Sequence, residues 1–366
     1  MKLVANDKQL NKIILNGYKS FSNSEIDLGR LNVLIGSNGS GKTNFISFFR
    51  MIQQILDQEG KFQAYIGKQG GPDAILHFGR KTTERLDLKL FFGDNGYAAT
   101  LQPTLDNRLL FTDESFFSDA KGLHSLGNGH FESKTYQRTD SEEVRSVFNS
   151  MRQWRIYHFH DTSESSLIKR LHNIGDNIYL RADGSNLAAF LFFLKEHHLD
   201  SYTKIVNTIK LVAPFFGDFC LRPSQNNPDT IELEWFERGQ DIPWKAHVLS
   251  DGTLRFICLA TVFLQPSEFQ PETLLVDEPE LGLHPYAIVI LGALIRSTST
   301  NKQIIISTQS SDLVNEFNPE DILVVNRYNG SSTIQRLSNQ ELEAWLHEYS
   351  LGDLWKKNLL SGRPGS

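Results

Sequence analysis

Cysteine and long apolar runs are both scarce in this chain of 366 residues, and each scarcity excludes a class of protein. The two cysteines, Cys220 and Cys258, fit a reduced cytosolic protein better than a disulfide-stapled secreted one. No apolar run is long enough to cross a bilayer, and the first residues lack the apolar core of a signal peptide. We therefore expect a cytoplasmic protein with no membrane partner.

An excess of basic residues is also missing, since 37 Lys and Arg stand against 43 Asp and Glu, for a formal net charge of −6. The chain as a whole is therefore not a polycation, although a local basic groove remains compatible with DNA binding. None of the 11 histidines shows a zinc spacing, and His158 and His160 read as solvated or core side chains. Internal repeats and sustained heptads are absent, which argues against a solenoid or a long coiled coil.

What remains is ordinary globular composition, with 40% hydrophobic and 22% charged residues. The length suits one large domain or two of medium size. Residues 1–117 read as short strands, a helix over 45–56 with one apolar face, and antiparallel strands from about residue 84 onward. Residues 60–80 are rich in glycine and read as an irregular connection.

The second part of the chain, 118–244, opens with a polar stretch over 118–150 that we expect to be a flexible insertion, and a helix is expected over 186–212. The third part, 245–366, alternates strands with a helix around 285–297. This alternation predicts right-handed crossovers and a largely parallel sheet, so the fold class expected is α/β. Outside the antiparallel region, the strands expected are 12–15, 24–28, 31–35, 231–235, 273–276, 303–307 and 321–325.

A glycine-rich segment joins the strand 31–35 to the following helix, and its sequence, GSNGSGKT, matches GxxxxGK[ST]. Glycines let backbone N–H groups turn toward a phosphate, and the helix adds its positive end. Lys42 would bridge the β- and γ-phosphates, and the Thr43 hydroxyl would ligate Mg²⁺. A chance match is the alternative, but the position between strand and helix favours nucleotide binding. The binding residues expected are Gly36, Ser37, Asn38, Gly39, Ser40, Gly41, Lys42 and Thr43.

An apolar strand over 273–276 ends in two carboxylates, Asp277 and Glu278. Ligands bind at the carboxyl ends of strands in open α/β folds. Asp277 would hold Mg²⁺, and Glu278 would polarise the attacking water as a general base. A strand capped by a solvated acidic turn is the alternative reading, and the phosphate loop makes it the weaker one.

A third element, LSDGT, enters an apolar helix with Ser250 and Gly252. Its serine could cap the helix, and its backbone could offer N–H donors to a phosphate. Alone this signal is weak. The position of LSDGT along the chain is more informative, because it lies after the phosphate loop and shortly before the acidic strand end.

This order of motifs resembles the ABC-type ATPases of the RecF/SMC/Rad50-like group. LSDGT is similar to the LSGGQ signature, and DEPELGLHP, from Asp277 on, resembles the Walker B and D-loop segment of RecF-like and OLD-like ATPases labelled AAA family. The openings LNGYKSF and LNVLIGSNGSGKTN are also similar, as is DGSNLAAFL at 183–191. The resemblance covers about 1–56 and 245–330. It implies an ABC-type P-loop NTPase head with an antiparallel β subdomain and a helical lobe.

The resemblance also implies residue roles. Ser250 and Gly252 would touch the γ-phosphate bound by a second subunit, so that ATP and Mg²⁺ are sandwiched in a head-to-tail homodimer or higher oligomer. Gln69 is the match to the catalytic Q-loop glutamine, with Gln63 as an alternative. Gln309 occupies the switch position, where histidine is usual, and a glutamine cannot become cationic there. His284 replaces the usual D-loop aspartate, and it either acts across the dimer or caps the next helix.

Two functions follow from the resemblance. The first is an ATP-hydrolysing dimer that acts on DNA in repair, recombination or phage defence. The second is a regulatory ATPase scaffold that holds and releases a separately encoded effector such as a nuclease, since the chain leaves no room for the TOPRIM nuclease of OLD-like proteins. A transporter subunit is disfavoured, because such subunits place the signature at about half the spacing that separates Lys42 from Ser250 here.

Overall fold

The computed structural model describes residues 9–57, 60–136 and 141–360, and the chain divides into two compact units. The first unit contains the described residues up to Trp154 and those from Asn318 on, and the second is Arg155–Phe317. Both combine helices with strands, so the expected α/β class is confirmed. The division at 117 and 244 expected from the sequence stays a prediction. None of the described helices is both long and apolar enough to span a membrane.

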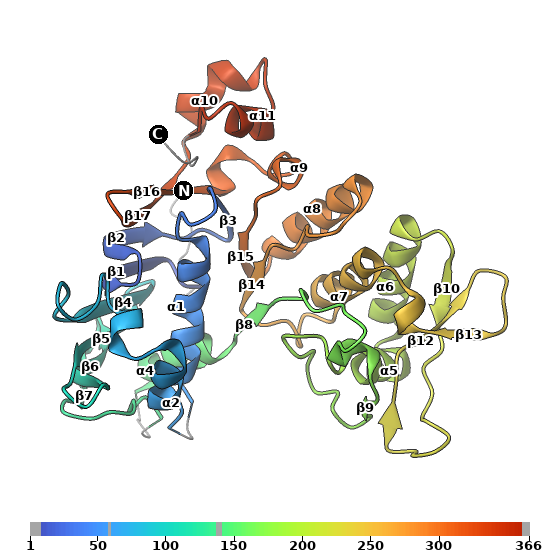
Figure 1. The fold of residues 1–366 in the computed structure, drawn as a ribbon, viewed down its shortest axis with the longest axis horizontal. Helices are drawn as coiled ribbons and strands as arrows, with labels where there is room; N and C mark the ends of the chain where they lie inside the picture. The colour runs from blue at the N-terminus through green and yellow to red at the C-terminus, as the bar shows by residue number, and fades with distance from the viewer. Residues whose placement is uncertain (1–8, 58–59, 137–140, 361–366) are drawn as a thin grey trace. The chain divides into compact units, whose positions relative to one another are not determined.

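An antiparallel sheet of six strands forms much of the first unit, as expected for residues 84–117 (Figure 1). Side chains alternate between buried and more exposed along its strands, for example over LDLKLFF, because successive residues of a strand face opposite sides. In the order β2-β1-β4-β5-β6-β7, its strands are β1 (Lys12–Tyr18), β2 (Phe21–Asp27), β4 (Leu86–Phe92), β5 (Asn95–Pro103), β6 (Leu109–Ser118) and β7 (Gly122–Gly127).

Helix α1 (Lys42–Ile55) packs on this sheet through the aromatic face expected from the sequence (Figure 1). The ring of Phe48 lies 5.7 Å from that of Tyr18 on β1, and the ring of Phe45 lies 6.4 Å from that of Phe21 on β2. Both pairs meet edge to face, the arrangement that aromatic rings prefer. The start of α1 is thereby fixed against the sheet.

The first unit also holds the strand that leads into the phosphate loop. Strand β3 (Leu31–Ile35) is entirely buried and runs parallel to β16 (Ile322–Tyr328), which pairs antiparallel with β17 (Ser331–Arg336). The remaining helices of this unit are α2 (Phe62–Gln69), α3 (Pro72–Ile75), α4 (Glu142–Arg152), η3 (Pro319–Asp321), α10 (Asn339–Leu346) and α11 (Leu351–Lys356).

Two predictions for this unit are wrong. Residues 60–80 are not irregular, because Phe62 and Ile66 bury one face of α2 and the left-handed Gly70 ends that helix. The stretch 118–150 is not simply a flexible insertion, since it contains β7 and most of α4. The Ser141 hydroxyl caps α4, and apolar residues at helical spacing lie between the polar ones that dominate its composition. Part of the expected insertion, 137–140, lies outside the described residues.

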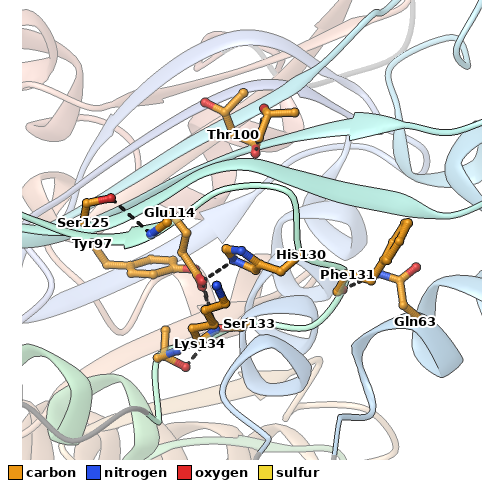
Figure 2. Close-up of polar contacts among 12 residues, drawn as sticks. Gln63, Tyr97, Thr100, Glu114, Ser125, His130, Phe131, Ser133 and Lys134 are labelled. Carbon is orange, nitrogen blue, oxygen red and sulfur yellow. Dashed lines mark hydrogen bonds and ion pairs between the residues drawn. The ribbon is translucent and has the colours of Figure 1, made fainter.

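A buried carboxylate joins the antiparallel sheet to the segment after β7 (Figure 2). Glu114 is 0% exposed, and its oxygens accept from Tyr97 Oη at 2.7 Å, from His130 Nε2 at 2.8 Å and from Ser133 Oγ at 2.6 Å. The backbone N–H of Lys134 donates at 2.9 Å. Burial, and then the nearby Glu114 charge, raises the pKa of Tyr97 well above its usual range. These donors offset the cost of burying the carboxylate.

The second unit is built on a parallel pair of strands, β14 (Thr273–Asp277) and β15 (Gln303–Ser307), as expected. Their register places Asp277 opposite Ser307. Its helices are η1 (Leu167–Lys169), α5 (Leu187–His197), α6 (Leu199–Val212), η2 (Ala246–Val248), α7 (Asp251–Leu264), α8 (Pro285–Ser299) and α9 (Ser311–Val314). Its other strands are β8 (Trp154–Tyr157) at the unit boundary, β9 (His172–Asn173), β10 (Phe216–Phe219), β11 (Thr230–Ile231), β12 (Glu234–Glu237) and β13 (Pro243–Lys245).

The single helix expected over 186–212 is instead the pair α5 and α6. His198 interrupts it with φ −139° and ψ 54°, outside the helical region. Its ring packs 5.0 Å from the ring of Phe269 and 5.4 Å from that of Phe193. Tertiary packing of one histidine therefore breaks a continuous apolar pattern.

Candidate functional site

The phosphate loop lies between β3 and α1 in the first unit, as the sequence predicts. Gly41 precedes α1 with φ +122°, and a Cβ there would clash with the hydroxyl of Ser332 on β17. That hydroxyl donates to the Ser40 carbonyl at 2.5 Å, and the Asn44 amide donates to Ser20 Oγ at 2.8 Å. Glycine is therefore required at position 41, and neighbouring segments hold the loop in place.

The interior of this loop suits an anion. The Lys42 ammonium folds back over the loop and donates to the Gly36 carbonyl at 2.5 Å and to the Ser37 carbonyl at 3.1 Å. No side chain among the described residues caps α1, and its first turn contains no acidic residue. The helix therefore leaves its positive end for a phosphate.

The phosphate loop also carries exposed side chains and one buried hydroxyl that lacks a partner within the described ranges. The side chains of Asn38 and Thr43 are exposed, so the threonine hydroxyl is accessible to a metal ion. The hydroxyl of Ser40 is buried and has no hydrogen-bond partner among the described residues. An orphaned donor in a loop of this shape fits a bound phosphate oxygen. The residues present therefore fit Mg²⁺-nucleotide.

Arg327, which sequence reasoning missed, lies beside this loop. Its Nη1 donates to the Gly39 carbonyl at 3.1 Å, and its Nε donates to the Gly330 carbonyl at 3.3 Å. It stands on β16, far from the loop along the chain, and no motif surrounds it. Only the pairing of β16 with β3 brings this guanidinium to the loop.

The carboxylate site lies in the second unit, at the carboxyl ends of β14 and β15. Ser307 Oγ donates to Asp277 Oδ1 across the paired strands, and the backbone N–H of Glu278 donates to the Ser307 carbonyl at 2.9 Å. No three His, Cys, Asp or Glu side chains of the described residues gather as a metal site. That Asp277 holds Mg²⁺ stays a prediction, and such an ion would take most of its oxygen ligands from nucleotide and water.

Glu278 and Gln309 meet at this edge. Glu278 adopts φ +44°, a left-handed conformation that costs energy for a residue with a side chain. The Gln309 side-chain amide donates to Glu278 Oε1. The structure thus brings together the expected general base and the expected switch residue within one unit, and it does so at a strained position, as is common at functional sites.

A second carboxyl group reaches the switch segment. Glu280 Oε1 accepts from Thr308 Oγ1 at 2.6 Å and from the backbone N–H of Gln309 at 3.0 Å. Burial raises the pKa of Glu280 above its ordinary value, and hydrogen bonds from the switch segment oppose that shift. No role was predicted for Glu280 from the sequence.

His160 and Arg255 complete the surroundings of the carboxylates. His160 Nε2 lies 3.2 Å from the Asp277 carbonyl oxygen. It is therefore a neighbour of the site, although the sequence predicts a solvated or core side chain. Arg255, on α7, donates to the His160 carbonyl at 2.9 Å and to the Leu281 carbonyl at 2.8 Å. Both side chains line a small pocket with Asp277 and Glu278. Only the fold reveals this proximity.

The signature loop lies at the start of α7. Ser250 caps this helix by accepting from the Thr253 N–H at 3.2 Å, and its side chain is exposed. A Cβ at Gly252 would clash with the Gly282 carbonyl. Packing within the unit therefore explains this glycine by itself, and Ser250 is the exposed group available to a phosphate. His284 caps α8 by accepting from the Tyr286 N–H at 3.3 Å.

The two glutamines proposed for the Q-loop differ in the hydrogen bonds that their side chains make. Gln63 Nε2 donates to the Leu109 carbonyl at 2.8 Å. It also donates to the Phe131 carbonyl at 2.6 Å (Figure 2). It therefore fastens α2 to the sheet and has no amide hydrogen left for a ligand. Gln69 is exposed at the end of α2. Its catalytic role stays a prediction.

These features define a P-loop ATPase of the ABC-type fold, and the comparisons agree. The family model described as "AAA domain, putative AbiEii toxin, Type IV TA system" matches residues 31–315. That span is most of the chain and includes the phosphate loop, the LSDGT loop and the acidic strand end, so the chain belongs to this family. No curated protein matches the chain.

Solved structures share its fold. The crystal structure of an SMC head bound to the C-winged helix domain of ScpA matches with a TM-score of 0.60 at 16% identity, covering 92% of this chain and 99% of that one. An SMC head domain with an extended coiled coil, bound to the C-terminal domain of ScpA derived from Pyrococcus furiosus, matches with a TM-score of 0.57 at 14% identity, covering 93% and 98%. The expected SMC/Rad50-like ABC-type head is confirmed as the fold.

Proposed function

We propose that this protein binds Mg²⁺-ATP through residues 36–43 and hydrolyses it to ADP and phosphate. The observation that carries the proposal is the hydrogen-bonded group at the carboxyl ends of β14 and β15, where Gln309 contacts Glu278 and Ser307 contacts Asp277. The family match spans this group and the phosphate loop alike.

In the proposed reaction, Glu278 accepts a proton from water as the water oxygen bonds to the γ-phosphorus. The bond from that phosphorus to the β,γ-bridging oxygen breaks, and ADP leaves with the electron pair. Lys42 and the start of α1 stabilise the negative charge of the phosphates. Thr43 and Asp277 would hold Mg²⁺, which when bound supplies positive charge that offsets the charge of the phosphates. Gln309 would donate its amide hydrogen to the γ-phosphate, and Gln69 would orient the water.

We further propose that two copies sandwich ATP head to tail, with Ser250 of one copy against the γ-phosphate bound by the other. Support comes from Ser250, whose side chain is exposed. The close contact that requires glycine at position 252 is with the Gly282 carbonyl and does not involve Ser250. The fold shared with SMC heads is consistent with this arrangement. Binding of ATP would join the copies, and hydrolysis would release them.

The proposal of ATP hydrolysis is tested by phosphate release from the purified chain. Lys42→Ala should abolish binding of a fluorescent ATP analogue, because the loop loses its ammonium. Lys121→Ala is a matched control, since it removes an exposed lysine that pairs with Glu143. Equal binding by both variants would refute the assignment of the loop.

As partner we propose a separately encoded effector protein, with DNA as the alternative ligand. An SMC head similar in fold is bound to a winged-helix domain, and the net charge of −6 favours a protein partner over wholesale DNA binding. A mobility-shift series with duplex DNA separates the two. DNA binding that weakens steeply with salt supports action on DNA in repair, recombination or defence. Absence of binding supports the scaffold.

A further inference from the structure

Glu280 lies on the loop after β14, two positions beyond Glu278, and its carboxyl group contacts the segment after β15. One oxygen accepts both from the Thr308 hydroxyl and from the Gln309 backbone. The other oxygen, Oε2, is buried and has no hydrogen-bond partner among the described residues. An unpaired buried acceptor costs free energy, so this placement calls for an explanation other than the stability of the loop.

Gln309 is consequently held at two points by two carboxyl groups. Glu280 holds its backbone N–H, and Glu278 holds its side-chain amide. The side-chain contact competes with the proposed chemistry, because an oxygen of Glu278 that accepts from Gln309 is occupied when a water proton must be accepted. The backbone contact involves no group that the chemistry needs. The side-chain amide of Gln309 can therefore turn while its backbone N–H stays bonded to Glu280.

We infer that Glu280 is a positioning residue that anchors the Gln309 backbone, so that the Gln309 amide can exchange the Glu278 carboxylate for the γ-phosphate during turnover. This inference rests on the proposed ATP hydrolysis. Without the anchor, the segment Thr308–Gln309 samples other conformations, and fewer molecules hold the amide within reach of the phosphate. Nucleotide binding, which residues 36–43 carry, does not depend on the anchor.

The experiment measures phosphate release and binding of a fluorescent ATP analogue for the full chain. Glu280→Ala should lower kcat severalfold, by no more than the loss of about tenfold expected for removal of the Gln309 amide, with KM and Kd within about twofold. Glu280→Gln keeps a carbonyl oxygen for both donors and should retain most of the kcat. Glu272→Ala is the matched control, because Glu272 pairs with Lys302 at 3.2 Å at the opposite ends of β14 and β15. It should leave both constants unchanged.

A double-mutant cycle separates positioning of Gln309 from general support of the loop. If Glu280 acts through Gln309, then Glu280→Ala should add little to the loss already caused by Gln309→Ala. Multiplied losses would overturn the inference. Should Glu280→Ala fail to fold, as judged by thermal melting, Thr308→Val tests the same anchor by removing one donor at nearly constant volume, and it too should lower kcat with unchanged Kd.

The outcomes distinguish this inference from the proposed function. Normal wild-type turnover with an unchanged kcat in Glu280→Ala, or in Thr308→Val, overturns the inference alone. A loss of kcat in Glu280→Ala that Glu280→Gln does not restore also overturns it. Absence of wild-type turnover overturns the proposed function, and the inference with it.

Discussion

The side-chain amide of Gln309 donates to the carboxylate of Glu278. The two residues follow neighbouring parallel strands, and the backbone hydrogen bond from Glu278 to Ser307 holds their loops together. In the proposed function, one is the base that takes a proton from water and the other is the donor to the γ-phosphate. Their hydrogen bond couples the base to the phosphate donor, and substitution of either residue tests this coupling.

Gln309→Ala should lower kcat for ATP about tenfold, the value of one hydrogen bond to a charged group. KM should change little, because the phosphate loop carries the binding. Steady-state phosphate release measures both constants. Gln309→His is the comparison, since a histidine restores a donor at this position and should recover part of the rate. Full activity in Gln309→Ala would exclude Gln309 from the chemistry.

The Glu114 cluster should contribute measurably to the stability of the first unit. Glu114→Ala leaves several buried donors unpaired, so the free energy of unfolding should fall by about 3 kcal/mol or more. Tyr97→Phe removes a single donor from the same cluster, and its cost should be about 1 kcal/mol. Urea denaturation followed by circular dichroism gives both values. Equal losses in the two variants would contradict this account of the cluster.

Glu280 should give stability a pH dependence of defined sign. Burial raises the pKa of its carboxyl, so the folded protein binds this proton more tightly than the unfolded chain does. Its contribution is therefore present at low pH and is lost as pH rises from the unfolded pKa, about 4.3, through the folded value. The unfolding free energy of the wild type should fall relative to that of Glu280→Gln over this window.

A series of urea denaturations at increasing pH measures that difference. A difference between wild type and Glu280→Gln that stays constant with pH, or grows as pH rises, would be incompatible with the raised pKa.

The local motifs of the site could be predicted from the sequence because each is a short string tied to one element. The strand, glycine loop and helix around Lys42 lie next to one another along the chain, and so do the strand β14 and Asp277. The amphipathic pattern of α1 likewise needs only helical spacing. Physical requirements within a few residues determine these features.

The rest depends on contacts between distant segments. Arg327 reaches the phosphate loop only because β16 pairs with β3, and Glu280 meets Thr308 only because β14 and β15 lie side by side. The break at His198 between α5 and α6 likewise reflects packing against Phe269. No local pattern marks Arg327 or His198, and the motif that contains Glu280 gives no signal of its partners on another segment.

The most direct test of the central claim is the mass of Glu278→Gln in solution with and without Mg²⁺-ATP. This substitution should preserve nucleotide binding but remove the base, so ATP persists and holds the two copies together. Light scattering after size exclusion should give 41.6 kDa for the free chain and about twice that mass with ATP. Ser250→Arg in the same background should prevent the doubling. A mass that does not respond to ATP, while the nucleotide is bound, would contradict the account.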